Sequence, residues 1–267
     1  MPYVNRGDAR IFWEAEGEGD PVLFVMGLGY PAAMWYRMLP YVTDAYRAIR
    51  VDNRGVGATG VPPGPYSIEQ MADDAAAVLE DAGEPSAHVV GASLGGFVAQ
   101  ELALRHPDLV RSLVLACTNC NGPHALLPSA EAIAMLGARA KMSPRDAAYA
   151  AVPFIYASST DPAMIEEDIA VRMRQPTEPE GYALQLEAAL SHAGTFERLP
   201  RIAVPTLVVH GSADRLVDPA NAPVLAGRIP GARLVMVDGA SHLLFTDRTD
   251  EVGRGLRAFL DEQAPAH

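Results

Sequence analysis

A single serine lies in a pattern that is typical of a catalytic nucleophile. Residues 91–95 read Gly-x-Ser-x-Gly, with Ser93 at the centre, a β-branched run before it and a Leu-bearing helical pattern after it. This layout predicts a sharp strand-to-helix turn that exposes the serine at its tip. Positions 91 and 95 should require glycine, because a side chain at either position would clash with the neighbouring helix or strand. The free N–H groups of the helix N-terminus would favour negative charge beside the serine.

A serine hydroxyl is a weak nucleophile without a base and a third group that orients this base. Asp214 follows the predicted buried strand Ile202–Gly211, and His242 follows the predicted strand Ala232–Val237. The chain order Ser93, Asp214, His242 is expected when a parallel sheet supplies each residue from the loop after a strand. These loops open at the same edge of the sheet, so the sequence predicts that the three side chains meet there.

Other carboxylates and histidines remain alternatives for these positions. Asp218 directly precedes a proline and better suits the start of the next helix, as an N-cap. Asp238 precedes a glycine and suits a turn. His88 and His210 flank predicted strands, whereas His242 is distinguished by its loop and its place in the chain order.

With these motifs, and with Asp-x-Arg-Gly-x-Gly at residues 52–57, nearly the whole chain resembles the α/β-hydrolase family. Within it, the chain is similar to small serine esterases and lactonases such as the 3-oxoadipate enol-lactonase-like proteins. The resemblance implies an α/β fold, with a mostly parallel twisted sheet, helices on both faces and an inserted helical lid. It also implies that Ser93 is the nucleophile, His242 the general base and then acid, and Asp214 the orienting carboxylate.

Acyl transfer also requires donors for the developing oxyanion. One donor would be the backbone N–H of Leu94, the residue after the nucleophile. The second should come from the turn after the predicted strand Pro21–Met26, and the resemblance places it at the Leu28 N–H. Many relatives have a histidine where this chain has Met26, a change that keeps the backbone donor.

These residues predict hydrolysis of a carboxylic ester or lactone through an acyl-serine, with no metal and no cofactor. Serine at position 93 argues against dehalogenase and epoxide hydrolase chemistry, in which relatives use a carboxylate nucleophile. A cofactor-free perhydrolase or haloperoxidase, and a hydrolase of C–C bonds in diketones, remain alternatives on the same triad. A third class is a binding protein without activity, because folds host many functions.

Two further patterns favour other functions. Residues 27–32 fit the dinucleotide fingerprint Gly-x-Gly-x-x-Ala, and Asp52 ends the next strand at about the distance that a ribose-binding acid requires. This interpretation leaves the serine, aspartate and histidine unexplained.

Cys117 and Cys120 form C-x-x-C, but the motif ends an apolar strand pattern instead of opening a helix, so a buried thiol is favoured over a redox site.

The predicted elements divide the chain into a core and an insertion. Strands and helices alternate in residues 1–118 and again in 200–267, which predicts a sheet covered on both faces. Residues 119–199 instead predict a cap of four helical segments, near 129–141, 144–151, 162–174 and 178–192. A cap rich in methionine and other apolar residues favours a mid-sized apolar small molecule, an ester or lactone, as substrate.

Bulk properties fit one globular enzyme. The chain has 267 residues, a formal net charge of −12, 49% hydrophobic and 20% charged residues. The negative charge disfavours nucleic acid and anionic membranes as partners. No apolar run approaches the length of a membrane span, and the first residues lack a signal-peptide pattern, so cytoplasmic localisation is the expectation. The sequence predicts no particular oligomeric state.

Overall fold

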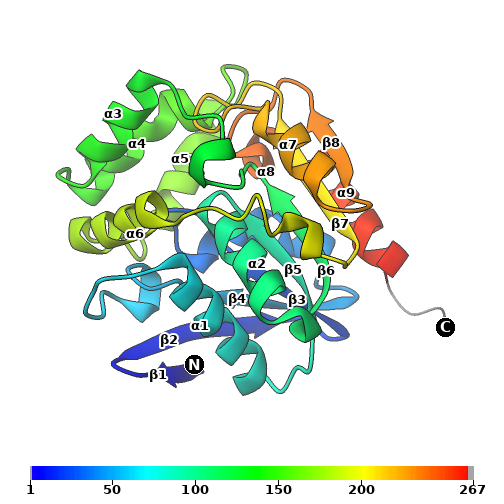
Figure 1. Cartoon of the computed structure of the whole chain (residues 1–267). Helices are drawn as coiled ribbons and strands as arrows, with labels where there is room; N and C mark the ends of the chain where they lie inside the picture. The colour runs from blue at the N-terminus through cyan, green and yellow to red at the C-terminus, as the bar shows by residue number, and fades with distance from the viewer. Residues whose placement is uncertain (1, 264–267) are drawn as a thin grey trace.

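A twisted sheet of eight strands forms the centre of the molecule (Figure 1). The structure is a computed structural model that describes residues 2–263. Along the sheet the strand order is β1-β2-β4-β3-β5-β6-β7-β8. The strands are β1 (Tyr3–Arg6), β2 (Ala9–Glu16), β3 (Asp20–Val25), β4 (Tyr46–Val51), β5 (Ala87–Ala92), β6 (Val110–Ala116), β7 (Thr206–Gly211) and β8 (Arg233–Val237).

Strand direction in most of the sheet follows the expectation from the sequence. At one edge the N-terminal strands form a hairpin, with β1 antiparallel to β2, and β2 is antiparallel to β4. All later neighbours in the sheet run parallel, from the β3–β4 pair to the β7–β8 pair. The α/β class with a mostly parallel sheet is therefore confirmed. Because parallel strands share a direction, their carboxyl ends gather at one edge, where ligands bind in open α/β sheets.

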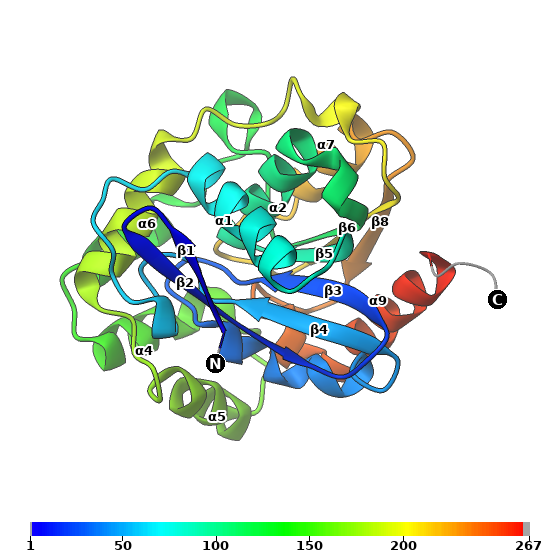
Figure 2. The same ribbon diagram turned by 90° about the horizontal axis from the view of Figure 1, so that it is seen from below.

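Helices cover both faces of the sheet (Figure 2). Successive strand residues point to opposite faces, so Val89 belongs to one buried cluster and Val90 to the other. The helices of this core are α1 (Ile68–Asp81), α2 (Leu94–Arg105), α7 (Asn221–Arg228), α8 (Leu244–Asp247) and α9 (Thr249–Gln263). Helices α1, α2 and α7 pack in the cluster of Val89, and α9 and a short 3-10 helix at Ala32–Arg37 pack in the cluster of Val90.

Helix α1 shows how closely local sequence determines an element. The Ser67 hydroxyl accepts a hydrogen bond from the Gln70 N–H at 3.0 Å, which satisfies one of the free donors of the first turn. The apolar residues at helical spacing, including Ile68 and Met71, are buried against the sheet. The helix stops before Gly83, which has a φ of +75° that favours glycine. Ser67 therefore caps the helix, but Gln70 Oε1 is buried without a hydrogen-bond partner, so the reciprocal bond of a capping box does not form in the described residues.

Four helices follow β6 and precede β7 along the chain, and they lie on the left side of the molecule in Figure 1. They are α3 (Ala130–Arg139), α4 (Pro144–Ile155), α5 (Pro162–Arg172) and α6 (Pro179–Ser191). All four predicted segments are helical, and α4 runs four residues beyond its predicted end at residue 151. The boundary of the cap at residues 119 and 199 stays a prediction. No helix within residues 2–263 is both long and apolar enough to cross a membrane.

The start of β7 differs from the prediction. The apolar run from Ile202 suggested a strand, but pairing with β6 begins at Thr206. Pro205 has no N–H to donate, and its carbonyl only accepts a hydrogen bond from the Leu113 N–H at 2.9 Å. The residues before it, Leu199–Arg201, form a 3-10 turn instead.

Candidate active site

Ser93 occupies the turn between β5 and α2. Its backbone has φ +54° and ψ −119°, a conformation that non-glycine residues rarely adopt. The turn is held on both sides, because the Ser93 N–H donates to the Ala116 carbonyl at 2.9 Å and the Thr118 hydroxyl donates to the Ser93 carbonyl at 2.7 Å. Observed strain at one serine, fixed by neighbours, is common where a side chain must be presented to a ligand.

The glycines of the motif are required by close approach. A Cβ on Gly91 would overlap the carbonyl oxygen of Gly95 in α2, and a Cβ on Gly95 would overlap the carbonyl oxygen of Val25 in β3. Both contacts are with backbone atoms that cannot move aside cheaply. The predicted reason for Gly91 and Gly95 is therefore confirmed.

Asp214 is buried in the loop after β7, with each carboxylate oxygen occupied. Its Oδ1 accepts hydrogen bonds from the backbone N–H groups of Leu216 at 2.8 Å and Val217 at 2.9 Å. Its Oδ2 lies 2.8 Å from His242 Nδ1 and 3.1 Å from His210 Nε2. Burial alone would raise the pKa of Asp214, but the two histidines outweigh it and hold the pKa well below its usual range. The group is thus an anion at neutral pH.

His242 lies in the loop after β8 and is itself only 5% exposed. The loop is anchored by two neighbours, since the Leu243 N–H donates to the Ile155 carbonyl at 2.7 Å and the Ser241 N–H donates to Asp247 Oδ2 at 2.6 Å. With Nδ1–H donating to Asp214, the lone pair lies on Nε2. Within residues 2–263 no hydrogen bond joins the Ser93 hydroxyl to His242, but both side chains line the same cavity. Such contacts often tighten only when substrate binds.

The turn after β3 lies directly beside Ser93. A Cβ built on Gly27 would stand 3.1 Å from the Ser93 Cβ and 3.6 Å from its Oγ. The next residue is Leu28, and across the serine Leu94 begins α2. In the described part of the chain, neither the Leu28 N–H nor the Leu94 N–H has a hydrogen-bond acceptor. These two donors remain the predicted oxyanion hole.

The cavity at this edge holds about 180 Å³ and is mainly apolar. An engineered protein cavity of roughly 150 Å³ admits benzene, so a short acyl chain or small ring fits. Core residues that line it include Ser93 and His242, and cap helices supply Leu136 and Leu186. Two further lining residues, Leu127 and Leu190, are 74% and 79% exposed.

The turn at residues 27–32 lacks two features that a dinucleotide-binding site requires. The glycine-rich turn leads into the 3-10 helix Ala32–Arg37, so no α-helix N-terminus is available there for a pyrophosphate. The Asp52 carboxylate is used by its own surroundings, because it accepts from the Ala32 N–H at 2.7 Å and the Ala58 N–H at 2.8 Å. Asp52 therefore stabilises the turn beside the site.

The structure also shows where the two cysteines and the two alternative aspartates lie. Cys117 and Cys120 are free, each is 1% exposed, and burial raises the pKa of both thiols, the opposite of a reactive pair. The N-cap expected at Asp218 is wrong, because α7 begins at Asn221 and Asp218 instead accepts the Ala220 N–H at 2.9 Å within the preceding turn. Asp238 accepts the Ser212 hydroxyl at 3.3 Å on the surface.

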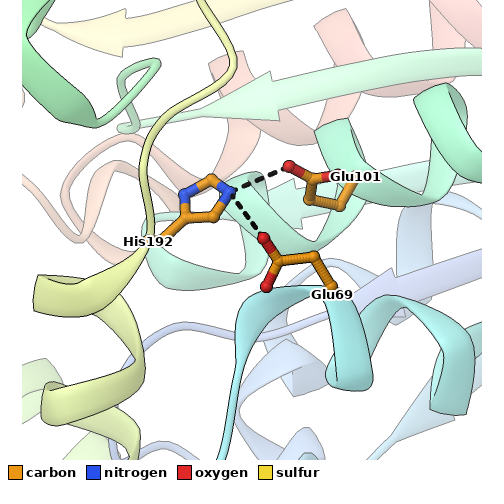
Figure 3. Close-up of side chains that lie close together, drawn as sticks. All are labelled: Glu69, Glu101 and His192. Carbon is orange, nitrogen blue, oxygen red and sulfur yellow. Dashed lines mark hydrogen bonds and ion pairs between the residues drawn. The ribbon is translucent and has the colours of Figure 1, made fainter.

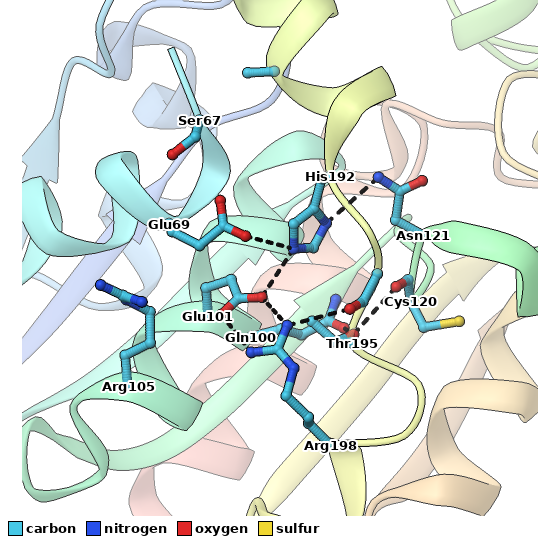
Figure 4. A network of polar contacts seen from close by, with 12 residues as sticks. Ser67, Glu69, Gln100, Glu101, Arg105, Cys120, Asn121, His192, Thr195 and Arg198 are labelled. Carbon is cyan, nitrogen blue, oxygen red and sulfur yellow. Dashed lines mark hydrogen bonds and ion pairs between the residues drawn. The ribbon is translucent and has the colours of Figure 1, made fainter.

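A second cluster of titratable side chains lies where α1, α2 and the end of α6 meet, and none of its members lines the cavity (Figure 3). His192 Nε2 is 2.9 Å from Glu101 Oε1 and 3.8 Å from Glu69 Oε1, a spacing that could hold a metal ion. However, Arg198 contacts both oxygens of Glu101 and already neutralises it (Figure 4). A cation there would displace or oppose a guanidinium, so the cluster is assigned a structural role that fastens the end of the cap to α2.

The structure gives two further residues a place near the site. His210, which the sequence analysis only placed beside a strand, is buried against Asp214, and its position four residues before the aspartate was the available signal for this contact. Arg139, at the end of α3, is buried and lines the cavity with Ser93. Nothing in the spacing of α3 separates it from an ordinary surface arginine.

Comparison with known proteins gives one consistent result. A family model described as alpha/beta hydrolase fold matches residues 20–249. A protein of Azorhizobium caulinodans, named provisionally as the carbamate hydrolase RutD, is 33% identical over 270 residues, which cover 98% of this chain and 99% of its own. A Mycobacterium tuberculosis protein, named provisionally as the non-heme bromoperoxidase BpoC, is 31% identical over 94% of this chain and 97% of its own. The crystal structure of the enol-lactonase from Burkholderia xenovorans superposes with a TM-score of 0.87 at 27% identity, covering 97% and 100% of the two chains.

Proposed function

The chain belongs to the alpha/beta hydrolase fold family, and we propose that it is a serine hydrolase of carboxylic esters or lactones. The observation that carries this proposal is the contact between His242 Nδ1 and Asp214 Oδ2 at 2.8 Å, at the edge of the cavity that Ser93 also lines. A histidine oriented by a buried anion, beside a serine on a strained turn, is the arrangement that activates a hydroxyl.

The reaction proceeds in two steps. The Ser93 Oγ attacks the substrate carbonyl carbon while His242 Nε2 takes its proton, and the backbone N–H groups of Leu28 and Leu94 stabilise the oxyanion. His242 then gives this proton to the leaving alcohol as the ester C–O bond breaks, which leaves an acyl-serine. A water molecule attacks the acyl carbon, its proton passes to His242 and on to Ser93 Oγ, and the carboxylic acid leaves. Asp214 fixes the imidazole tautomer and stabilises the imidazolium.

The substrate expected for this cavity is a small molecule with an apolar body. Its lining is largely aliphatic and its volume is about 180 Å³. The likeness to an enol-lactonase supports a lactone or short ester as the reacting group. Simple chromogenic esters of two to six carbons are therefore the first substrates to try.

The experiment that tests the proposal replaces the nucleophile. Ser93→Ala should remove hydrolysis of 4-nitrophenyl esters and labelling by a fluorophosphonate probe, while circular dichroism remains that of the wild type. Ser159→Ala is the matched control, because it makes the same change at an exposed serine of the cap that does not line the cavity, and it should keep wild-type activity. Ester turnover that survives in Ser93→Ala would refute the acyl-serine mechanism.

One other chemistry has specific support from the relative named as a bromoperoxidase. In that case, Ser93 would pass an acyl group from a carboxylic acid to hydrogen peroxide, and the resulting peracid would oxidise bromide. Peroxide-dependent bromination of monochlorodimedone in acetate buffer, measured beside ester hydrolysis, separates the two. A bromination rate above the hydrolysis rate would favour this alternative.

A further inference from the structure

A second buried histidine contacts the carboxylate of the proposed triad. His210 Nε2 lies 3.1 Å from Asp214 Oδ2, the same oxygen that His242 Nδ1 approaches to 2.8 Å. The side chains of His210 and Asp214 are both fully buried. Unlike His242, His210 is not among the described residues that line the cavity, so it cannot touch a substrate there. An effect of His210 on the reaction must therefore pass through Asp214.

The hydrogen of the His210 ring can be placed from its neighbours. Nε2 also lies 3.1 Å from the carbonyl oxygen of Val217, and the Asp214 carboxylate is an anion at neutral pH. Both neighbours only accept hydrogen bonds, so Nε2 carries the hydrogen. The N–H donates to the Val217 carbonyl, and its positive end lies beside Asp214 Oδ2.

The other ring nitrogen of His210 has no partner. Nδ1 is buried, and no atom of the described residues forms a hydrogen bond with it. A buried polar atom without a partner costs free energy, and an apolar side chain at this position would avoid that cost. The cost is offset where the Nε2–H holds a charged group in place.

His210 joins the loop that carries Asp214 to the sheet. Asp214 Oδ1 accepts the N–H groups of Leu216 and Val217, but both donors belong to the same loop as the aspartate. His210 instead lies near the end of β7, and its Nε2 contacts the loop twice, at the Val217 carbonyl and at Asp214 Oδ2. These contacts relate the direction of the carboxylate to a strand of the sheet and not to the loop alone.

The N–H of His210 also affects where the proton of the triad lies. Burial raises the pKa of Asp214, but the contacts with His242 and His210 outweigh it and hold the pKa well below its usual range. A carboxylate that is a weak base does not take the Nδ1 proton when His242 becomes an imidazolium. It stays an anion and stabilises that cation, as the proposed mechanism requires.

We propose that His210 is a positioning residue of the reaction, which directs Asp214 Oδ2 at His242 Nδ1 through its Nε2–H. This inference rests on the proposed function, because it assigns a further residue to the same site. His210 contacts neither the substrate nor the reacting atoms. Its removal should therefore slow the chemical step and leave substrate binding unchanged.

The test replaces His210 by a residue without the donor and by one that keeps it. His210→Leu has no N–H, whereas the side-chain amide of His210→Gln reaches about as far as Nε2 and can donate to both oxygens. For 4-nitrophenyl butyrate, kcat should fall about 10- to 100-fold in His210→Leu, the loss expected for one hydrogen bond to a charged group, and KM should stay within about twofold. His210→Gln should recover kcat to within about threefold of the wild type.

His106→Leu is the matched control, with circular dichroism to check the fold of every variant. His106 Nε2 also contacts an aspartate, Asp73 Oδ1 at 2.8 Å, but this pair is partly exposed and neither residue lines the cavity. The control should keep wild-type kinetics. A wild-type kcat in His210→Leu, or equal losses of kcat in His210→Leu and His210→Gln, would overturn the proposal.

A double-mutant cycle shows whether His210 acts through Asp214. In the Asp214→Asn background, His210→Leu should lower kcat by no more than about twofold, because the charge that it positions is already gone. A merely structural role of His210 would lower kcat by the same factor in both backgrounds. That result would reject the positioning role.

A spectroscopic measurement separates this inference from the proposed function. The proton between His242 Nδ1 and Asp214 Oδ2 should give a low-field proton NMR signal. In the Ser93→Ala background, which hydrolyses nothing, His210→Leu should shift or remove this signal and His210→Gln should keep it. Should the wild type neither hydrolyse esters nor react with a fluorophosphonate, the serine mechanism fails, while a signal that depends on His210 still supports the positioning of Asp214. A signal that is absent from Ser93→Ala, or unchanged by His210→Leu, rejects the positioning role even in an active esterase.

Discussion

Two of the buried histidine–carboxylate contacts within residues 2–263 can be compared, His242–Asp214 and His192–Glu101, because only His242 lines the cavity that Ser93 also lines. His242 lies 2.8 Å from Asp214 at the carboxyl edge of the sheet, and His192 lies 2.9 Å from Glu101 beneath α2. Both carboxylates are fully buried, and each histidine is 5–6% exposed. Distance and burial therefore do not distinguish a catalytic pair from a structural one.

The partners of the second ring nitrogen do distinguish them. His192 Nδ1 lies 3.5 Å from Asn121, and Arg198 compensates the charge of Glu101 from the other side. Asp214 has no guanidinium partner in the described residues, so His242 is the group that gains from its charge when it becomes protonated. A base needs a free nitrogen toward the ligand and an anion behind it, and the pair at Asp214 has both.

The largest effect expected from this comparison is on catalysis. His242→Ala should lower kcat for an ester by roughly 10⁴- to 10⁶-fold, because no other group can take the serine proton. His192→Ala, the matched change in the other pair, should keep kcat but lower the midpoint of thermal unfolding. Steady-state kinetics measures kcat for both variants, and scanning calorimetry measures their unfolding midpoints. An equal loss of kcat in the two variants would contradict the assignment of one pair to catalysis and the other to structure.

Asp214→Asn should have the next largest effect. The amide keeps the shape of the side chain but no longer holds the imidazole tautomer or stabilises its cation, so kcat should fall about 10⁴-fold. Asp218→Asn, a few residues later and at the surface turn, serves as control with wild-type kinetics. An active Asp214→Asn enzyme would show that the carboxylate is structural and that His210 or another group orients His242.

Much of this arrangement could be predicted from the sequence, because it depends on local patterns. The turn at Ser93 follows from two glycines, because a side chain at either position would collide with backbone atoms, and the start of α1 follows from the N-cap at Ser67. The α/β class follows from the alternation of strands and helices, and the family comparison confirms it. The roles of Ser93, Asp214 and His242 stay predictions until the variants are measured.

What the sequence could not predict depends on contacts between distant segments. Arg139 enters the cavity because α3 packs with its end toward Gly29, a direction that helical spacing alone does not specify. His210 contacts Asp214 because the loop after β7 turns back on its own strand. The apolar residues from Ile202 have the spacing of a strand, but pairing with β6 begins only at Thr206, after Pro205. The apolar pattern alone does not show where a proline ends the pairing.

A moderate, pH-dependent effect on stability is expected at the structural pair. Burial alone would raise the pKa of Glu101, but hydrogen bonds and charges from His192 and Arg198 outweigh it and lower the pKa to about 2. A depressed carboxyl pKa contributes stability above the ordinary value near 4.5, and this contribution is lost as the pH falls toward 2. Glu101→Gln should therefore lower the free energy of unfolding by about 3 kcal/mol at pH 7 and much less at pH 3.

Urea unfolding at the two pH values measures this difference directly. The control is Glu131→Gln, an exposed glutamate in the first turn of α3, whose effect should be small at both pH values. A loss of stability that does not change with pH would mean that Glu101 is not an ion pair in the folded protein. The pair of His242 and Asp214 would then be the only one of the two in which the carboxylate is charged.

The smallest effect is expected at Glu69, and it tests whether the structural pair is a metal centre. The Glu69 side chain is 40% exposed and stands 3.8 Å from His192 Nε2, so Glu69→Gln should change the free energy of unfolding by less than about 0.5 kcal/mol. Because Arg198 already contacts both oxygens of Glu101, Zn²⁺ should raise the unfolding midpoint of neither protein. A saturable rise with Zn²⁺ in the wild type that Glu69→Gln abolishes would show that a cation can displace the guanidinium. The pair under α2 would then also be a ligand site, and a neutralising arginine would no longer separate structural from functional pairs.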